Sequence, residues 1–170
     1  MPYRTSTQGV VLHHSLTKDG TVANWGAIRD YHMSIRLDGA TITPAAYKKL
    51  PATEKARCVM PWKDIGYHYG IELIDGHYEI LLGRPESEVA AAVKEQRFND
   101  TRIHVCLVGN FDEAPPPPKQ LDALVRLLKD ILARYRFGTR NITTHHAVAP
   151  YKTCPGLQFP LDEVIRRVQE

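Results

Sequence analysis

The sequence has few cysteines and no long apolar run. Cys58, Cys106 and Cys154 are the only cysteines in 170 residues, and an odd number of widely spaced thiols does not build a disulfide framework. No segment reaches the roughly 18 consecutive apolar residues that a membrane-spanning helix needs. We therefore expect neither a disulfide scaffold nor a membrane partner.

A strong surplus of one charge is also missing. Lysine and arginine number 22 against 19 aspartates and glutamates, which leaves a formal net charge of +3. Because these basic residues are scattered along the chain, we expect no nucleic-acid partner. With 43% hydrophobic and 24% charged residues, the composition is typical of a soluble globular protein. We expect a monomer with one domain spanning residues 1–170.

Strand and helix patterns alternate along the chain. Apolar, β-branched runs predict strands at residues 8–14, 67–74, 78–82, 103–109 and 141–144. Apolar residues at helical spacing predict helices at residues 25–35, 86–96, 121–135 and 161–168. Asp75-Gly76 between two of the strands is typical of a hairpin turn. The alternation predicts an α/β fold, a single domain whose central mixed β-sheet has helices packed on its faces.

Residues 38–64 interrupt this alternation. Asp38-Gly39 predicts a turn, Thr43 can cap a short helix, and Pro51 and Pro61 punctuate the remainder. We expect an ordered excursion that either lines the ligand cleft or decorates the surface.

Two predicted strands end on adjacent histidines, His13-His14 and His145-His146, and Cys154 follows in a loop. In sheets of this kind the carboxyl ends of strands line the ligand crevice, so the histidine pairs are candidate neighbours. Two imidazoles and a thiolate, here His13, His145 and Cys154, suit Zn²⁺ and leave its fourth position open, as in catalytic sites. Spacing alone leaves a second interpretation open, with hydrogen-bonded strand-end histidines and an inert buried thiol.

Four blocks of residues occur in an order found in one family. They are His-His-Ser at 13–15, Ile-Gly-Tyr-His-Tyr at 65–69, Val-Cys-Leu-Val-Gly-Asn-Phe-Asp at 105–112 and His-His-Ala-Val-Ala-Pro-Tyr-Lys-Thr-Cys-Pro-Gly at 145–156. On these blocks the sequence resembles the zinc-dependent N-acetylmuramoyl-L-alanine amidases of the amidase-2 type. That family includes phage lysis amidases, wall-recycling amidases and peptidoglycan recognition proteins. The resemblance covers about residues 8–165.

The resemblance implies an activity and a set of roles. It implies hydrolysis of the amide between N-acetylmuramic acid and L-alanine in peptidoglycan or a muropeptide, with Zn²⁺ as cofactor. The zinc ligands would be His13, His145 and Cys154, and His145 aligns better than His146. Tyr67 and Lys152 match the catalytic pair of the phage-type enzymes. The Lys152 ammonium can stabilise a developing oxyanion, and the Tyr67 hydroxyl can hydrogen-bond the attacking water or the intermediate.

Two other functions remain open from the sequence. A non-catalytic peptidoglycan-binding module is one, although family members that only bind usually lack the cysteine that is present here as Cys154. A Cys-His hydrolase with Cys154 as nucleophile and His145 as base is the other. Such a hydrolase gives no role to His13 and would survive a chelator.

The N-terminal residues 1–6 show no basic stretch followed by an apolar run, the pattern of a secretory signal. We expect a protein that is cytoplasmic as synthesised, without a signal peptide. Both a prophage lysis enzyme and a wall-recycling enzyme fit this expectation. A lysis enzyme would reach the cell wall through a separate lysis or export route.

Overall fold

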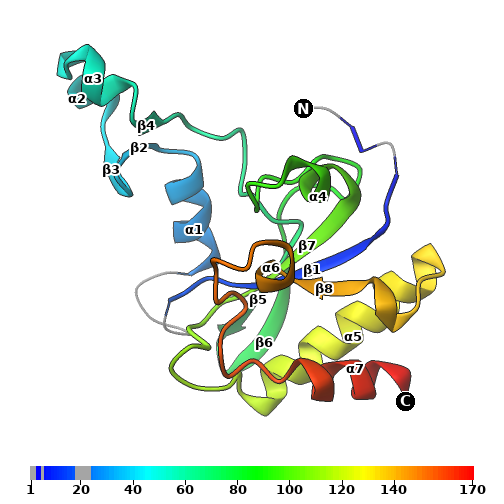
Figure 1. The fold of residues 1–170 in the computed structure, drawn as a ribbon. Coiled ribbons are helices and arrows are strands. Elements are labelled where there is room, and N and C mark those ends of the chain that lie inside the picture. Colours follow the sequence, from blue (N-terminus) through cyan, green and yellow to red (C-terminus); the bar gives the residue numbers. More distant parts are fainter. Residues whose placement is uncertain (1–2, 5, 18–23) are drawn as a thin grey trace.

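A five-stranded mixed sheet forms the centre of the molecule in a computed structural model that describes residues 3–4, 6–17 and 24–170 (Figure 1). Its strand order is β6-β5-β7-β1-β8. The strands are β1 (Gly9–His14), β5 (Tyr69–Ile74), β6 (His77–Leu82), β7 (Arg102–Leu107) and β8 (Ile142–Thr144). Only the β5–β6 pair is antiparallel. The predicted mixed central sheet is confirmed. The prediction of a chain without a signal peptide rests on residues 1–6, of which residues 1, 2 and 5 lie outside the described residues.

The predicted hairpin joins β5 to β6. Asp75 and Gly76 both have positive φ, 49° and 82°, as a two-residue turn of type I′ requires. The hairpin places β5 next to β7 at the edge of the parallel part of the sheet.

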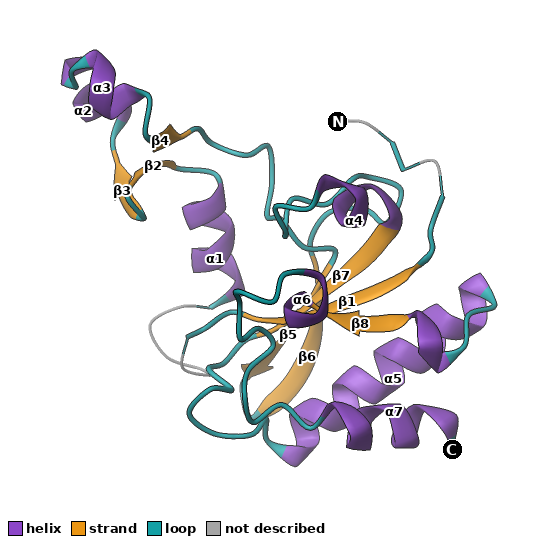
Figure 2. Ribbon diagram, in the orientation of Figure 1, coloured by secondary structure: helices purple, strands orange, loops and turns teal. Residues whose placement is uncertain are grey.

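One face of the sheet packs against two helices, α5 (Pro118–Tyr135) and α7 (Leu161–Gln169), as Figures 1 and 2 show. Alternate residues of β1 and β7, such as Leu12 and Val105, point into this core and meet Leu124 and Leu128 of α5. These four side chains are fully buried. The long helix predicted at residues 121–135 and the terminal helix are both confirmed.

The opposite face is covered by α1 (Trp25–His32) near the hairpin. Asn24 caps this helix, because its side chain accepts a 2.8 Å hydrogen bond from the Ala27 N–H. Trp25 packs with Ile65 and Cys106 in a second, smaller apolar cluster. The smaller cluster leaves the carboxyl ends of β1 and β8 free to present polar side chains on this face.

Two predicted helices differ from the structure. The helix predicted at 25–35 ends at His32, and the one predicted at 86–96 is absent, with α4 (Gln96–Thr101) beginning where it should end. The N–H of Ala91 donates instead to the Gly66 carbonyl, and the N–H groups of Ala92 and Val93 donate to Asn99 Oδ1. Tertiary hydrogen bonds have replaced the helical ones.

Residues 35–59, here called the lobe, stand away from the main sheet beyond α1 (Figure 1). Its elements are β2 (Ile35–Leu37), β3 (Ala40–Ile42), α2 (Pro44–Lys49), α3 (Ala52–Lys55) and β4 (Cys58–Val59). The three strands form their own antiparallel sheet in the order β3-β2-β4. Thr43 caps α2 as predicted, but the three short strands were not predicted.

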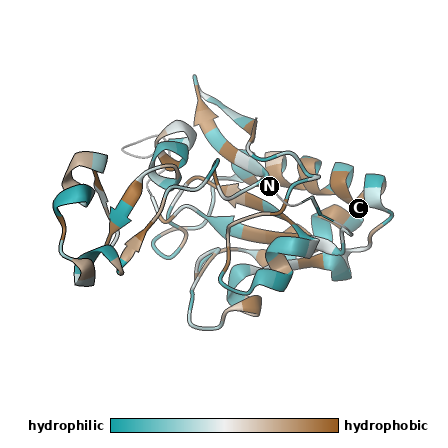
Figure 3. Cartoon of the chain, turned by 90° about the horizontal axis from the view of Figure 1, so that it is seen from above, coloured by the Kyte–Doolittle hydropathy of each residue, from teal (hydrophilic) through white to brown (hydrophobic). Residues whose placement is uncertain are grey.

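The remaining short helices are η1 (Thr139–Asn141) and α6 (His145–Val148), on either side of β8. Figure 3 shows hydrophobic segments gathered in the main sheet and in bands along the helices beside it. None of the helices in the described residues is long and apolar enough to cross a membrane.

Candidate active site

Strand ends bring the predicted ligand residues together. His13 lies at the carboxyl end of β1, and His145 follows β8 as the first residue of α6, which the Thr144 hydroxyl caps by accepting from the Ala147 N–H. Cys154 comes from the loop after α6. One potential ligand atom from each of His13, His145 and Cys154 lies within 4.8 Å of the other two.

The geometry and donor set fit a zinc ion. His13 Nδ1 and Cys154 Sγ are 3.7 Å apart. With Zn–S of about 2.3 Å and Zn–N of about 2.0 Å, a nitrogen and a sulfur ligand of a tetrahedral zinc ion lie about 3.5 Å apart. The spacing of His13 and Cys154 is therefore close to what the ion requires, and His145 offers a third donor atom within 4.8 Å of both.

The loop that carries Cys154 is fixed by main-chain contacts. The His14 N–H donates to Cys154 Sγ at 3.3 Å, and the His146 N–H donates to the Cys154 carbonyl at 2.6 Å. Gly156 has φ +121°, and a Cβ there would lie 2.4 Å from the Phe111 carbonyl carbon. A glycine is therefore required for the loop to approach Phe111 and hold the thiol against β1.

Burial controls protonation at the three residues. It lowers the pKa of His13 well below its usual value. Burial, helped by the Lys152 charge, lowers the pKa of His145 to about 4. Both imidazoles are therefore neutral at neutral pH, as metal ligation requires. Burial raises the pKa of the Cys154 thiol to about 12, so a cation would have to displace its proton.

Behind His13 lies a row of buried imidazoles. His13 Nε2 is 2.9 Å from His104 Nδ1, and His104 Nε2 is 3.0 Å from the Phe98 carbonyl oxygen. The main-chain N–H of His104 donates to His68 Nδ1 at 2.9 Å, and His68 Nε2 is 3.0 Å from the Glu88 carbonyl oxygen. Every ring nitrogen of His68 and His104 therefore has a polar partner.

Tyr67 packs beside His13, with ring centroids 5.2 Å apart. Burial, reinforced by Cys106 and Cys154, raises the pKa of the Tyr67 hydroxyl well above 10. The hydroxyl is therefore neutral at neutral pH and can donate a hydrogen bond. Cys106, predicted to be a structural thiol, is fully buried.

A cleft of about 400 Å³ opens beside His145. Lys152 and Tyr151 form one side of it, residues 90–94 form another, and Trp62 also lines it. Trp62 is the residue of the 38–64 excursion that reaches this lining. The Tyr151 hydroxyl donates to Glu95 Oε1 at 3.1 Å, which ties the two sides together. Lys152 and His145 thus share one accessible space.

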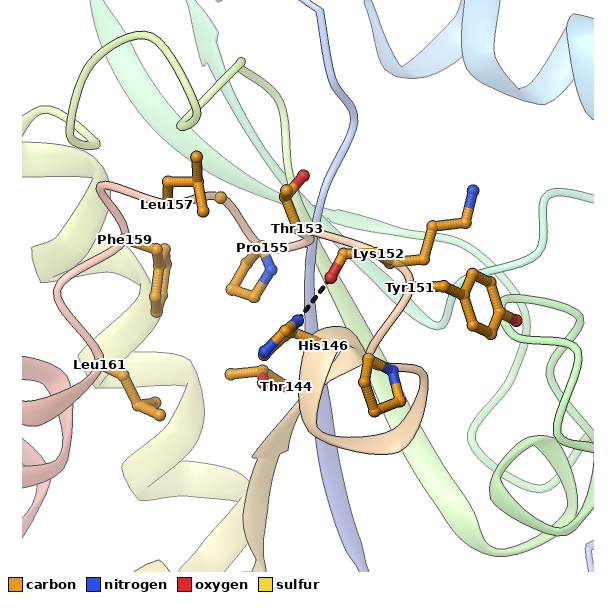
Figure 4. Close-up of a pocket in the computed structure, with 11 residues that line it drawn as sticks. Thr144, His146, Tyr151, Lys152, Thr153, Pro155, Leu157, Phe159 and Leu161 are labelled. Carbon is orange, nitrogen blue, oxygen red and sulfur yellow. Dashed lines mark hydrogen bonds between the residues drawn. The ribbon is translucent and has the colours of Figure 1, made fainter.

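His146 lies on the other side of the loop at residues 150–156. It lines a separate pocket of about 350 Å³, and its Nδ1 is 2.6 Å from the Lys152 carbonyl oxygen. In Figure 4 the Lys152 side chain extends away from the His146 ring. Of the two adjacent histidines, His145 is the one that lies with His13 and Cys154.

His104 and His32 belong to the site but were not singled out from the sequence. His32 Nδ1 accepts from the Gly66 N–H at 3.2 Å, and its ring lies 4.5 Å from that of Trp62. Alternation along β7 indicates that His104 shares a face of the sheet with Cys106. The proximity of His104 to His13 could be recognised only with the register between β1 and β7.

Comparison with known proteins gives one consistent result. The profile of the Amidase_2 family, N-acetylmuramoyl-L-alanine amidase, matches residues 3–157. The chain is 31% identical over 161 residues to the endolysin of Escherichia phage T7, covering 92% of this chain and 85% of that protein. The structure of the amidase LysC from Clostridium intestinale URNW superposes with a TM-score of 0.66 at 22% identity, over 99% and 93% of the two chains. That of Drosophila PGRP-LB Y78F in complex with tracheal cytotoxin gives 0.64 at 20%, over 96% and 83%.

Proposed function

The chain belongs to the Amidase_2 family and is an N-acetylmuramoyl-L-alanine amidase, and we propose that its hydrolysis of peptidoglycan depends on a zinc ion held by His13, His145 and Cys154. The observation that carries the proposal is the convergence of these three donors within 4.8 Å beside the cleft. A zinc ion held there would polarise the amide carbonyl and activate water at neutral pH.

Lys152 and Tyr67 are proposed to act on the reacting amide. Lys152 lines the cleft together with His145, and its ammonium can offset negative charge that develops on the amide oxygen. The neutral Tyr67 hydroxyl next to His13 can donate a hydrogen bond to the same region. Neither side chain is needed as a metal ligand.

Two features favour this function over its alternatives. The Cys154 side chain is only 8% exposed, and its Sγ has His13 Nδ1 as a neighbour at 3.7 Å. A nucleophilic thiol needs an open approach to the carbonyl, so burial supports the ligand role. The complete donor set, including the thiol, supports catalysis over a module that only binds peptidoglycan.

The substrate is proposed to be the peptidoglycan wall, bound by a monomer without nucleic-acid or membrane partners. Similarity to a phage endolysin supports a lysis enzyme that reaches the wall through a separate lysis or export route. A comparison of turnover on intact sacculi and on soluble muropeptides tests this role, because a wall-recycling enzyme would prefer the soluble fragments.

Metal removal and restoration test the zinc proposal. The purified chain should contain about one zinc ion, lose amide cleavage after exhaustive chelation and regain it with added zinc. His13→Ala should lose the ion and the activity while remaining folded. The matched control His146→Ala should keep the ion, because His146 lies outside the cluster formed by His13, His145 and Cys154. Full activity in metal-free protein would overturn the proposal.

A further inference from the structure

His104 lies next to His13 because of the register between two parallel strands. On β1 and β7, Val11 pairs with His104 and His13 pairs with Cys106. His13 and His104 are therefore diagonal neighbours on the same face of the sheet. Their side chains are 1% and 0% exposed, so water cannot replace a missing partner for either ring.

The direction of each hydrogen bond in this row follows from chemistry. The Phe98 carbonyl can only accept, so His104 Nε2 carries a hydrogen. A neutral imidazole then has no hydrogen on Nδ1, and His104 Nδ1 must accept from His13 Nε2. With its hydrogen on Nε2, His13 has a free lone pair on Nδ1. That nitrogen is the one 3.7 Å from Cys154 Sγ.

We propose that His104 is a positioning residue that fixes the tautomer and ring orientation of His13, so that His13 Nδ1 is ready to bind zinc. The inference rests on the proposed function. Ligating histidines commonly donate their second N–H to a partner that sets the tautomer and orients the ring. Here the partner is a second imidazole, whose own tautomer is fixed by a backbone carbonyl.

The carbonyl that anchors the row is itself held in place. The Phe98 oxygen accepts from the Arg102 N–H at the end of α4, where the chain enters β7. The start of β7 therefore fixes both the Phe98 carbonyl and His104. Removal of the His104 ring would leave a buried N–H on His13 without an acceptor, which favours another tautomer or a rotated ring.

His68 provides a matched comparison within the same cluster. It is also buried, at 1% exposure, and its ring is hydrogen-bonded to the main-chain N–H of His104 and to the Glu88 carbonyl. The ring of His68 holds main-chain groups, whereas that of His104 holds a ligand side chain. A loss of packing alone would therefore affect both positions, but a loss of positioning would affect only His104.

The test is the zinc affinity of folded protein, measured by competition with a chromogenic chelator, for His104→Leu, His104→Asn and His68→Leu. Loss of such a partner costs about 10-fold to 100-fold in metal affinity, which is the result expected for His104→Leu. His104→Asn can place an amide oxygen near the Nδ1 position and should remain within about threefold of the wild type. His68→Leu should be less stable but should bind zinc as tightly as the wild type.

Cobalt substitution adds a spectroscopic measurement. The absorption bands of bound Co²⁺ should change in His104→Leu and be restored in His104→Asn, since they report the orientation of the ligands. Wild-type zinc affinity together with a wild-type cobalt spectrum in His104→Leu would overturn the inference. A wild-type chain that bound no zinc would instead overturn the proposed function.

If His104→Leu does not fold, His104→Gln replaces it in the comparison. Glutamine places its amide beyond the Nδ1 position, so it should bind zinc at least about tenfold more weakly than His104→Asn. Equal affinity in these two variants would also overturn the inference.

Discussion

The candidate active site and the lobe are stabilised in opposite ways. Around the site, the imidazoles of His13, His68 and His104 are buried and bonded to one another or to the main chain. In the lobe, residues 35–59, only Ile35 and Arg36 are buried. The Arg36 guanidinium lies 4.9 Å from the Tyr31 ring centroid, near the base of the lobe. Side chains that must keep one geometry are enclosed, whereas the lobe is open to solvent.

Charge separates the two regions as well. The lobe contains five basic and two acidic side chains, so it alone has the +3 formal charge of the whole chain. The remainder of the chain is balanced. Changes in the lobe should therefore alter surface charge and little else, while changes at the site should alter chemistry.

The largest expected difference is between a lysine at the candidate active site and a lysine next to the lobe. Lys152→Ala should reduce turnover of a muramyl peptide by about 10²-fold to 10³-fold, because it removes a group that stabilises charge in the transition state. Its zinc content should stay at the wild-type level. The exposed Lys63, next to the lobe, is the control, and Lys63→Ala should stay within about twofold. Equal turnover in the two variants would remove Lys152 from catalysis.

A second contrast concerns the stability of the fold in acid. On the body of the protein, outside the lobe, Glu86 makes this stability depend on pH. Burial alone raises the pKa of Glu86, but hydrogen bonds from Arg134, Tyr135 and Tyr69 outweigh it and lower the pKa to about 2. An unfolded glutamate titrates near 4.3, so this stabilisation is complete above that pH and is lost as the pH falls toward 2. Glu86→Gln should cost about 1 to 2 kcal/mol at pH 7. It should also flatten the loss of stability in acid, as measured by denaturant unfolding.

The lobe offers the control for that measurement. Asp38 pairs with Arg57, and both side chains are more than half exposed. Exposed pairs of this kind contribute little, so Asp38→Asn should change the unfolding free energy by less than about 0.5 kcal/mol. An equal effect of both variants would contradict the difference drawn between the body of the protein and the lobe.

The smallest expected effect is that of removing most of the lobe. Leu37 and Cys58 are paired on antiparallel strands, so a two-residue Asn-Gly turn can replace residues 38–57. The shortened chain retains Trp62, which lines the cleft. Turnover of a soluble muramyl peptide should stay within about threefold and zinc content should not change. A loss of more than about tenfold would mean that the lobe shapes the cleft.

Local sequence patterns predicted the elements that position the ligands. The run at residues 8–14 is largely apolar and the strand before His145 is β-branched, so both could be recognised without tertiary information. The long helix at residues 121–135 was recognisable from its apolar face. The proximity of His13 and His145 could be expected because strand ends meet at one edge of the sheet, whereas the resemblance to the amidase family was needed to assign Cys154 to the same site.

Features that depend on distant contacts could not be predicted. The role of His104 depends on the pairing of Val11 with His104, and register is not encoded within either strand. The segment at residues 86–96 has helical propensity, but Asn99 engages its N–H groups from outside. The strands of the lobe are only two or three residues long, too short for an alternating pattern to be recognised.

X-ray absorption at the zinc K edge tests the central claim, the ligand set, most directly. Zinc-loaded wild-type protein should show one sulfur neighbour at about 2.3 Å and two imidazole nitrogens at about 2.0 Å. Cys154→Ser should lose the sulfur contribution. A wild-type spectrum with no sulfur neighbour, or with the sulfur retained in Cys154→Ser, would contradict the assignment of His13, His145 and Cys154 as the zinc site.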